Sequence, residues 1–340
     1  MSLTLWRTVL AAVLCAAVLA TVNAQPVQHV ILNVDAQNIV QYLEDVSDVT
    51  MFATNPNVTV PIGAKDFQQQ IIIGDIVAVN GQPVKGTTVH RPQNVRVSPT
   101  APAGQAIGDI TRGNIQIVSF EILGVDGTPI GTIHCAGLGG VGNPPTGAPL
   151  SVTQGNNAIV GGTGAFLGAR GYQGQAVPAQ AVAIRQASMT EDPANRRKNG
   201  GGTSRFVLDL IPMEAPQFVV TSGGVSIFHG DFSPVTPAKP ATSGEMLIAM
   251  TTGLGPTTPG VDPGQPFPAI PANPLQQVNS PVTVTVGGQS ATVINKIGWP
   301  GLVDAYRVDF QVPPGTQSGP ATIQLTVAWI PGPTVAIPIQ

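Results

Sequence analysis

A glycine-rich string at residues 157–171 constrains the fold of this chain more than any other feature. It reads Asn-Ala-Ile-Val-Gly-Gly-Thr-Gly-Ala-Phe-Leu-Gly-Ala-Arg-Gly, with an apolar run before its first glycines. Glycine inside a strand pattern marks a bulge, a sharp bend or the close approach of another backbone. A small barrel needs such creases to close its sheet on itself. The string therefore favours a β-barrel.

A phosphate-binding loop is the alternative interpretation of the same glycines, and the flanking sequence disfavours it. A dinucleotide fingerprint needs a strand, a tight glycine turn and then a helix whose N-terminus faces the pyrophosphate. Residues 158–160 can form the strand, but residues 171–178 read Gly-Tyr-Gln-Gly-Gln-Ala-Val-Pro and cannot sustain a helix. A Walker loop needs lysine after its last glycine, whereas Ala169 and Arg170 follow Gly168.

The string resembles the late-hairpin signature of the allene oxide cyclase and dirigent superfamily. In that signature a strand ends in Gly-Gly-Thr-Gly, an aromatic residue follows, and Gly-x-Arg-Gly opens the next strand. The resemblance covers roughly residues 28–213 and implies an antiparallel β-barrel. The segments that support it, in the order the family has them, are 74–81, 115–123, 126–127, 130–134 and 204–211.

The N-terminus has the pattern of a secretory signal peptide. Arg7 supplies the positive charge, residues 9–20 the apolar core, and Val-Asn-Ala at 22–24 a small-residue cleavage site. Cys15 suggests a lipoprotein, but Leu14 stands where such a signal needs a small residue. We expect cleavage near Ala24 and a mature chain that is secreted or lies in the periplasm or on the exterior of the cell envelope.

Composition excludes several classes of partner. The net charge is −3, only 10% of residues are charged, and no basic stripe with interleaved aromatic residues occurs, so nucleic acid is not an expected partner. No later segment has enough uninterrupted apolar length to cross a bilayer, so we expect no membrane span after signal removal. The mature chain keeps one cysteine, Cys135, and must rely on its core because it cannot form an internal disulfide.

Beyond residues 212–217 the pattern changes to short alternating strands. Gly287-Gly288 between two such runs is a good hairpin turn, whereas the proline-rich stretch 256–274 is expected to be a surface crossover. About eight short strands in roughly 120 residues predict an immunoglobulin-like β-sandwich. The predicted strands are 218–221, 225–228, 246–250, 282–286, 291–294, 306–312, 321–328 and 334–337.

This second half resembles the C-terminal domain family known from Solibacter and other acidobacterial exported proteins. The resemblance covers roughly residues 218–340, and it implies a spacer, anchor or adhesive module with no catalytic role. The residues that carry it are 244–245, 253–256, 284–288, 298–301, 306–313, Gly319 and the closing strand. The expected division is therefore a signal peptide at 1–24, a barrel at 25–215 and a sandwich at 216–340.

Two segments inside the barrel half each have two open interpretations. Residues 35–48 are the best short helix candidate, although their spacing also suits a strand. Residues 186–205 hold the densest charge, and we interpret them as a solvated loop before the last barrel strand. The alternative is a lid or docking loop in which Arg196, Arg197 and Lys198 meet an anionic group.

No metal site, cofactor site or hydrolase triad is expected. None of the four histidines has a partner at metal-ligand spacing. His134 and Cys135 are consecutive on a predicted strand and so point to opposite faces. A Gly-x-Ser-x-Gly elbow is missing from the sequence.

Four residues are the pocket candidates: Asp75, Glu121, Arg170 and Tyr172. Asp75 can instead cap a turn, and Arg170 can brace the barrel end through backbone carbonyls. The face of the sheet on which Glu121 lies is open. The resemblance implies catalysis by confinement of a reactive substrate in a largely apolar cavity, and such catalysis leaves little trace in a sequence.

Three functions remain open from the sequence. The barrel binds a small apolar ligand or an extracellular partner while the sandwich is a spacer or adhesion module; or the barrel is a cyclase or a stereocontrolling protein; or the protein is purely structural. The barrel interior separates them, because a cavity of a few hundred Å³ with converging polar groups favours binding or catalysis, whereas a packed interior favours structure.

Overall fold

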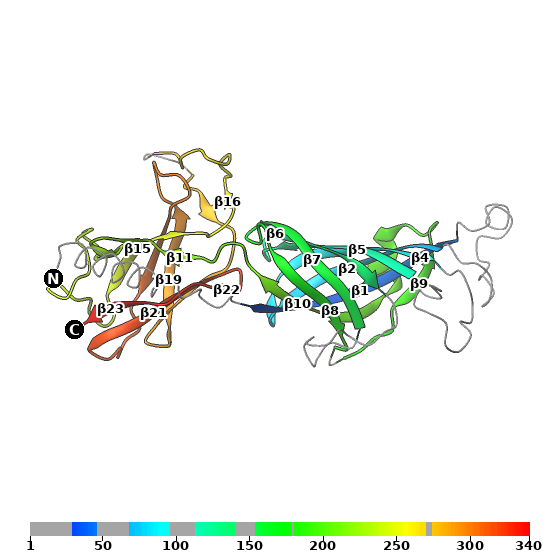
Figure 1. Cartoon of the computed structure of the whole chain (residues 1–340), viewed down its shortest axis with the longest axis horizontal. Coiled ribbons are helices and arrows are strands. Elements are labelled where there is room, and N and C mark those ends of the chain that lie inside the picture. The colour runs from blue at the N-terminus through cyan, green and yellow to red at the C-terminus, as the bar shows by residue number, and fades with distance from the viewer. Residues whose placement is uncertain (1–28, 46–67, 96–112, 140–153, 179, 270–273) are drawn as a thin grey trace, which may run out of the picture.

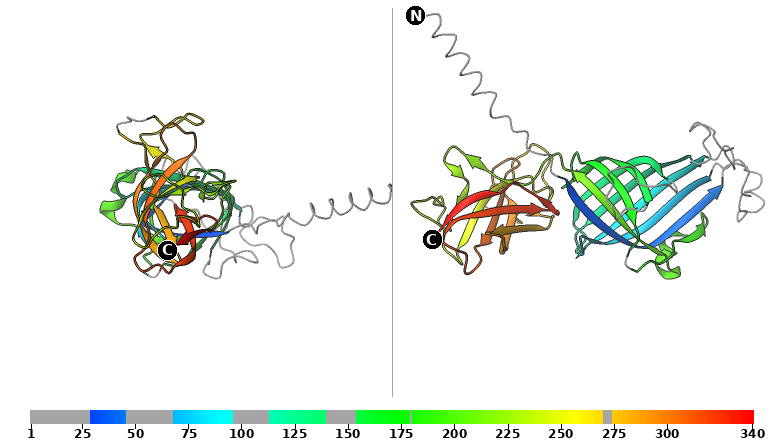
Figure 2. Two further views of the ribbon diagram at one scale, coloured as in Figure 1. Left: turned by 90° about the vertical axis from the view of Figure 1, so that its left-hand side faces the viewer. Right: turned by 60° about the horizontal axis from the view of Figure 1, so that its bottom comes forward.

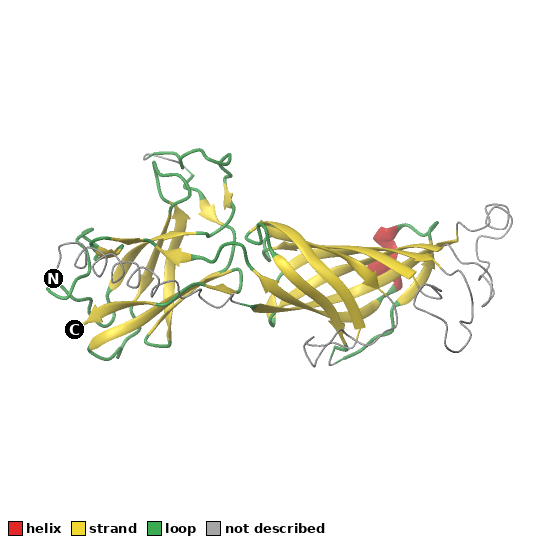
Figure 3. Cartoon of the chain, viewed as in Figure 1, coloured by secondary structure: helices red, strands yellow, loops and turns green. Residues whose placement is uncertain are grey.

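The structure, a computed structural model, describes residues 29–45, 68–95, 113–139, 154–178, 180–269 and 274–340. Nearly all regular structure in these ranges is β (Figure 3), and its helical elements are the single turn η1 (Pro193–Asn195) and α3 (Arg196–Asn199). Figure 1 shows two domains in chain order, a barrel and a second β domain. The prediction of an all-β chain with a barrel followed by a β-sandwich is confirmed. The expected signal peptide lies outside the described residues.

The first domain is a closed antiparallel barrel of eight strands. Neighbouring strands follow the order β2-β4-β5-β6-β7-β8-β10-β1, and pairing of β1 with β2 closes the ring. Two short strands lie beside it: β3 (Gln82–Pro83) pairs with β2, and β9 (Arg185–Ser188) runs parallel to β1. The barrel strands are β1 (Val30–Asp45), β2 (Gln68–Val79), β4 (Lys85–Val95), β5 (Gly113–Leu123), β6 (Pro129–Gly139), β7 (Gln154–Gly164), β8 (Arg170–Ala176) and β10 (Gly202–Ile211).

The glycine-rich string forms the hairpin between β7 and β8. The aromatic residue of the signature, Phe166, is buried in the connecting turn. Gly164 and Gly168 in this hairpin have positive φ angles of 63° and 68°, which glycine adopts at little cost. The string therefore makes a crease at the end of a barrel strand, and no helix follows it.

The helix considered for residues 35–48 is not formed. As far as the structure describes this segment, it belongs to β1, a strand of 16 residues. Its register with both β2 and β10 shifts around Asn38, which has a φ of 53°. This β-bulge shifts the alternation of the strand, so that Ile39 joins the barrel core as Ala36 does. Val40 lies on the opposite face and is buried as well.

The second domain consists of two β layers that share β19 (Gln289–Gly298). One layer is built around β15 (Met246–Thr252) and β20 (Tyr306–Gln311), and the other around β18 (Val282–Val286), β21 (Gly319–Val327) and β23 (Val335–Ile339). Its shorter strands are β11 (Gln217–Phe218), β12 (Val220–Thr221), β13 (Gly224–Val225), β14 (Ile227–Phe228), β16 (Thr257–Thr258), β17 (Gln277–Val278) and β22 (Ile330–Pro331).

Gly287 and Gly288 make the expected turn between β18 and β19, with φ angles of 58° and 78°. Residues 212–216 connect the last barrel strand to β11. The buried apolar residues of the two domains form one connected cluster, so the second domain packs directly on one end of the barrel.

The two ends of the barrel differ. At the end that faces the second domain, which we call the proximal end, adjacent strands are joined by short turns such as 124–128 and 165–169. At the distal end, residues 177–201 join β8 to β10, and residues 46–67, 96–112 and 140–153, which join the other strands, lie outside the described residues. Figure 2 shows the second domain at the other end of the barrel.

Candidate functional site

The middle of the barrel interior is filled by three rings. His90 on β4, Phe120 on β5 and Phe206 on β10 meet across the barrel, with ring centroids 5.0 to 6.1 Å apart. Burial lowers the pKa of His90 to about 4, so the ring is neutral at ordinary pH. Its Nε2 atom shares a hydrogen bond with the Thr88 hydroxyl at 2.9 Å. Other buried residues of the barrel core include Leu32, Val34, Ile76, Val118, Ile122, Ile133, Cys135, Ile159, Leu208 and Leu210.

The interior changes character toward the distal end, where uncharged polar side chains replace apolar ones. Gln41 Nε2 donates to Gln70 Oε1 at 2.6 Å, and Asn157 Nδ2 donates to Gln173 Oε1 at 2.6 Å. We call this end of the interior the mouth, and it consists of Gln41, Gln70, Asn157, Gln173, Gln175 and Ser204. Gln175 Nε2 donates to the Ser204 hydroxyl at 2.7 Å. All six residues of the mouth are therefore uncharged, and most of them carry a carboxamide side chain.

Two features of the mouth indicate room for a further group. A pocket of about 150 Å³ lies beside Gln175 and Ser204, and its other lining residues are 176–178, Ala181 and Thr203. Asn157, which is buried, has an Oδ1 atom that accepts no hydrogen bond from the part of the chain that the structure describes. A buried polar atom without a partner costs free energy, and native structures contain few of them.

None of the four sequence-predicted candidates points into this interior. Glu121 is exposed on the outer face of β5, between the inward residues Phe120 and Ile122. Arg170, also exposed, donates from Nη1 to the carbonyls of Ala169 at 3.0 Å and Gly168 at 3.3 Å. Arg170 thus contacts the backbone of the turn that precedes it, as a brace would.

Tyr172 and Asp75 lie elsewhere on the barrel wall. Tyr172 is half-buried on the outer side of β8 and packs with Ala176 and Val207; its burial raises its pKa. Asp75 alternates with the inward-facing Gly74 and Ile76, so its carboxylate lies on the outer face of β2. The structure therefore does not bring the four candidates together.

Asp75 holds the charged segment 185–200 against the barrel wall. Its Oδ1 accepts from Arg196 Nη2 at 2.5 Å and Arg197 Nη2 at 2.8 Å, and its Oδ2 accepts from Arg197 Nε at 2.8 Å and Asn38 Nδ2 at 3.0 Å. Burial alone would raise the pKa of Asp75, but these hydrogen bonds outweigh it and lower the pKa to about 2. We call this arrangement the Asp75 latch. Arg196 and Arg197, which the alternative interpretation of this segment assigned to a lid or docking loop, thus meet a carboxylate of their own chain.

The polar residues of the mouth were missed by the sequence reasoning. The available signal was strand alternation, because Gln173 and Gln175 are two apart and so share a face of β8. No sequence signal told which face is inward. Among the described residues, no group of three His, Cys, Asp or Glu could hold a metal ion, and no helix is long and apolar enough to cross a membrane.

Cys135 offers a direct check on the closed interior. It is fully buried in the barrel core, and burial raises the pKa of its thiol to about 12. The thiolate is the reactive form, so we expect Ellman's reagent to leave native protein of residues 25–340 unlabelled at pH 8 and to label one thiol after unfolding. Fast labelling of native protein would contradict a tightly closed barrel.

Comparison with known proteins adds little to this description. No protein-family model matches the chain, and no curated protein matches it. Among solved structures, a polysaccharide lyase is similar at 9% identity with a TM-score of 0.17, over 92% of this chain and 40% of the lyase chain. The chain thus spans less than half the length of that protein, and so low a TM-score carries no argument about fold or function.

Proposed function

We propose that this chain is a non-catalytic binding protein of the cell exterior. In this proposal the mouth of the barrel receives a small uncharged molecule, and the C-terminal domain is a spacer or adhesion module. The observation that carries the proposal is the buried Asn157 Oδ1 atom, which faces no donor among the described residues. A ligand hydroxyl or amide N–H would satisfy it.

The chemistry of the mouth refines the kind of ligand. Carboxamides both donate and accept hydrogen bonds, so they suit a neutral molecule with hydroxyl or amide groups better than a hydrocarbon. The sequence alone favoured an apolar ligand. A cyclase that confines a hydrocarbon substrate is less well supported, because His90, Phe120 and Phe206 occupy the middle of the barrel.

The proposal is tested by small molecules that purify with the full mature chain, residues 25–340. Native mass spectrometry, followed by denaturation and untargeted small-molecule analysis, should find a neutral, hydroxyl- or amide-bearing compound. Asn157→Leu and the milder Ser204→Ala should each reduce its retention, by roughly tenfold for the loss of one good hydrogen bond in a buried site.

Glu121→Gln is the matched control, because Glu121 lies on the outer face of the barrel and does not touch the mouth. It should retain the ligand as the unchanged protein does. If a broad screen of neutral polar compounds shows neither co-purification nor thermal stabilisation of the folded protein, the mouth is filled by the chain itself and the purely structural function is correct.

A further inference from the structure

A second pocket lies at the junction of the two domains, at the proximal end of the barrel. Its volume is about 260 Å³. The barrel contributes β3, Val84 after it, the β5–β6 turn and Ile130, and the second domain contributes Asn279, Pro281, Lys296 and Trp329. Pockets for drug-sized ligands measure roughly 300–1,000 Å³, so this junction pocket suits a smaller molecule.

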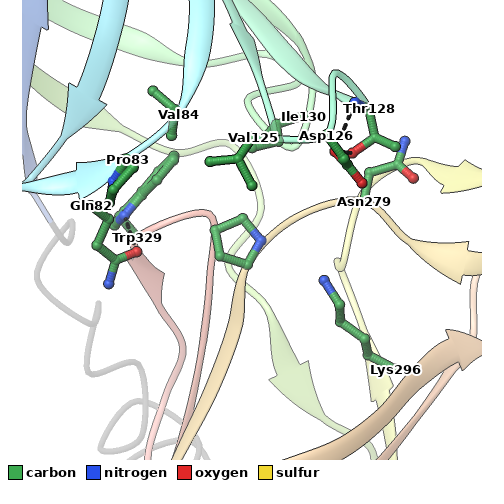
Figure 4. Close-up of a pocket in the computed structure, with 12 residues that line it drawn as sticks. Gln82, Pro83, Val84, Val125, Asp126, Thr128, Ile130, Asn279, Lys296 and Trp329 are labelled. Atoms are coloured by element: carbon green, nitrogen blue, oxygen red, sulfur yellow. Dashed lines mark hydrogen bonds between the residues drawn. The ribbon is translucent and has the colours of Figure 1, made fainter.

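Direct hydrogen bonds between the domains hold the junction pocket in shape. Trp329 Nε1 donates to Gln82 Oε1 at 2.9 Å, and Asn279 Nδ2 donates to the carbonyl of Pro129 at 2.9 Å. Figure 4 shows Gln82 and Trp329 on one side of the pocket and Asn279 on the other, with Val125 between them. The pocket walls are therefore held in place before a ligand arrives, and binding does not have to spend free energy on ordering them.

The turn that presents Trp329 is costly to form. Ala328 and Trp329 occupy the two central positions between β21 and β22, with φ angles of 47° and 65°. Two-residue hairpins of this kind normally use Asn and Gly there, because other side chains disfavour positive φ. Backbone strain of this sort gathers at ligand clamps and active sites.

Two opposite charges lie on the wall of the junction pocket without pairing to each other. Asp126 and Lys296 interact electrostatically, but none of the ion pairs between described residues joins them. Asp126 Oδ1 accepts from the Thr128 N–H at 3.0 Å and hydroxyl at 2.7 Å. No other described residue donates a hydrogen bond to Oδ2 of Asp126. Figure 4 shows the Lys296 amine across the opening from the Asp126 side chain.

Lys296 also has hydrogen-bonding capacity left. Its ammonium donates to the Ser280 carbonyl at 2.5 Å, which uses one of three N–H donors. The side chain is half-buried, and that burial lowers the pKa of Lys296 although Asp126 opposes the effect. An anionic group in the pocket would replace the lost water around the ammonium.

We propose that the junction pocket binds a free amino acid with an apolar side chain. The carboxylate meets Lys296, the α-ammonium meets Asp126, and the side chain rests against Val125, Pro281 and the Trp329 ring. A simple carboxylate would bring its charge near Asp126, and a simple amine would bring its charge near Lys296. The two charges of the pocket thus favour an amino acid, which carries both charges, over a molecule with only a carboxylate or only an amine.

The test is calorimetric titration of the full mature chain with three related probes. L-leucine carries both charges, N-acetyl-L-leucine only the carboxylate, and L-leucinamide only the ammonium. We expect L-leucine to bind and each derivative to bind at least tenfold more weakly, since a charged hydrogen bond is lost in each. Equal binding of all three, or no binding of L-leucine at millimolar concentration, would overturn the proposal.

Two variants locate the charges. Lys296→Met should weaken L-leucine binding and remove its advantage over L-leucinamide. Asp126→Asn, which keeps the Oδ1 acceptor for Thr128, should remove its advantage over N-acetyl-L-leucine. The exposed control variants Lys198→Met and Asp262→Asn should bind as the unchanged protein does. Unchanged binding in folded Lys296→Met and Asp126→Asn would place the ligand elsewhere. Asn157→Leu should leave L-leucine binding intact, because the mouth and the junction pocket lie at opposite ends of the barrel.

Discussion

Gly171→Ala is expected to lower the free energy of unfolding of the barrel by about 4 kcal/mol, the sum of backbone strain and overpacking. Gly171 has a φ of 139°, a conformation that side-chain-bearing residues rarely adopt. A Cβ atom there would also overlap the carbonyl oxygen of Asp209 on β10. Neither strand can yield, because β8 pairs with β7 on one side and with β10 on the other.

Gly161→Ala is the matched control from the same glycine-rich string. The nearest atom to a Cβ at Gly161 is Arg170 Nη1, at 3.8 Å, so alanine fits and the change should stay within roughly 0.5 kcal/mol. Urea unfolding of both variants measures the difference directly, and thermal melting should show a loss of about 10 °C for Gly171→Ala. Equal losses in the two variants would mean that the string does not act through close backbone approach.

The features of the fold that local chemistry determines were predictable from the sequence. Positive φ angles at Gly164, Gly168, Gly287 and Gly288 are requirements of single turns, and glycine marks them in the sequence. Strand alternation likewise located β5, β10 and β21, because side chains on a strand point to opposite faces in turn. These signals need no knowledge of distant residues.

The helix considered for residues 35–48 was wrong for a physical reason. The β-bulge at Asn38 shifts the alternation of β1 by one residue, so the inward-facing positions change from even numbers, such as Ala36, to odd numbers, such as Ile39. A strand with one shift of phase imitates the spacing of a helix face. The outer face of β1 is also covered, because the segment 185–200 contacts β1 through α3 and Val40 and Tyr42 are buried beside it. A strand buried on both faces loses the polar alternation that identifies it.

The candidate site was less predictable than the fold. Whether Asp75 or Glu121 faces inward depends on which alternate positions of its strand point into the closed barrel, and one sequence does not show this. Arg196 and Asp75 are 121 residues apart in the chain, so no local pattern links them. The junction pocket likewise needs turns from two domains.

The Asp75 latch gives the second large prediction. Asp75→Asn should lower the free energy of unfolding by about 3 kcal/mol at pH 7, because removal of one partner leaves the buried Arg196 guanidinium without its counter-charge. In Asp75→Asn, the segment 185–200 should also exchange its amide hydrogens faster than it does in the unchanged protein, because the latch no longer holds it to the barrel wall.

Asp35→Asn is the control for charge loss alone. Asp35 pairs with Arg205 through two hydrogen bonds of 2.6 and 2.8 Å, but the Arg205 side chain is 39% exposed against 11% for Arg196. An ion pair with this exposure contributes roughly 1 kcal/mol or less. Hydrogen exchange in segment 185–200 should be unchanged in Asp35→Asn. Equal exchange in the two variants would show that Asp75 does not hold the segment.

The pH dependence distinguishes the charge of Asp75 from its shape. The pKa of this carboxyl falls from 3.8 to about 2 on folding, so the ionised form is the one that folding favours. Its contribution to stability is complete above pH 3.8 and disappears as the pH falls through 2. The stability gap between the unchanged protein and Asp75→Asn should therefore be constant from pH 7 to pH 5 and shrink between pH 4 and pH 2, as urea unfolding at each pH would measure. A gap that stayed constant down to pH 2 would mean that the amide disturbs the packing and that the arginine contacts contribute nothing through charge.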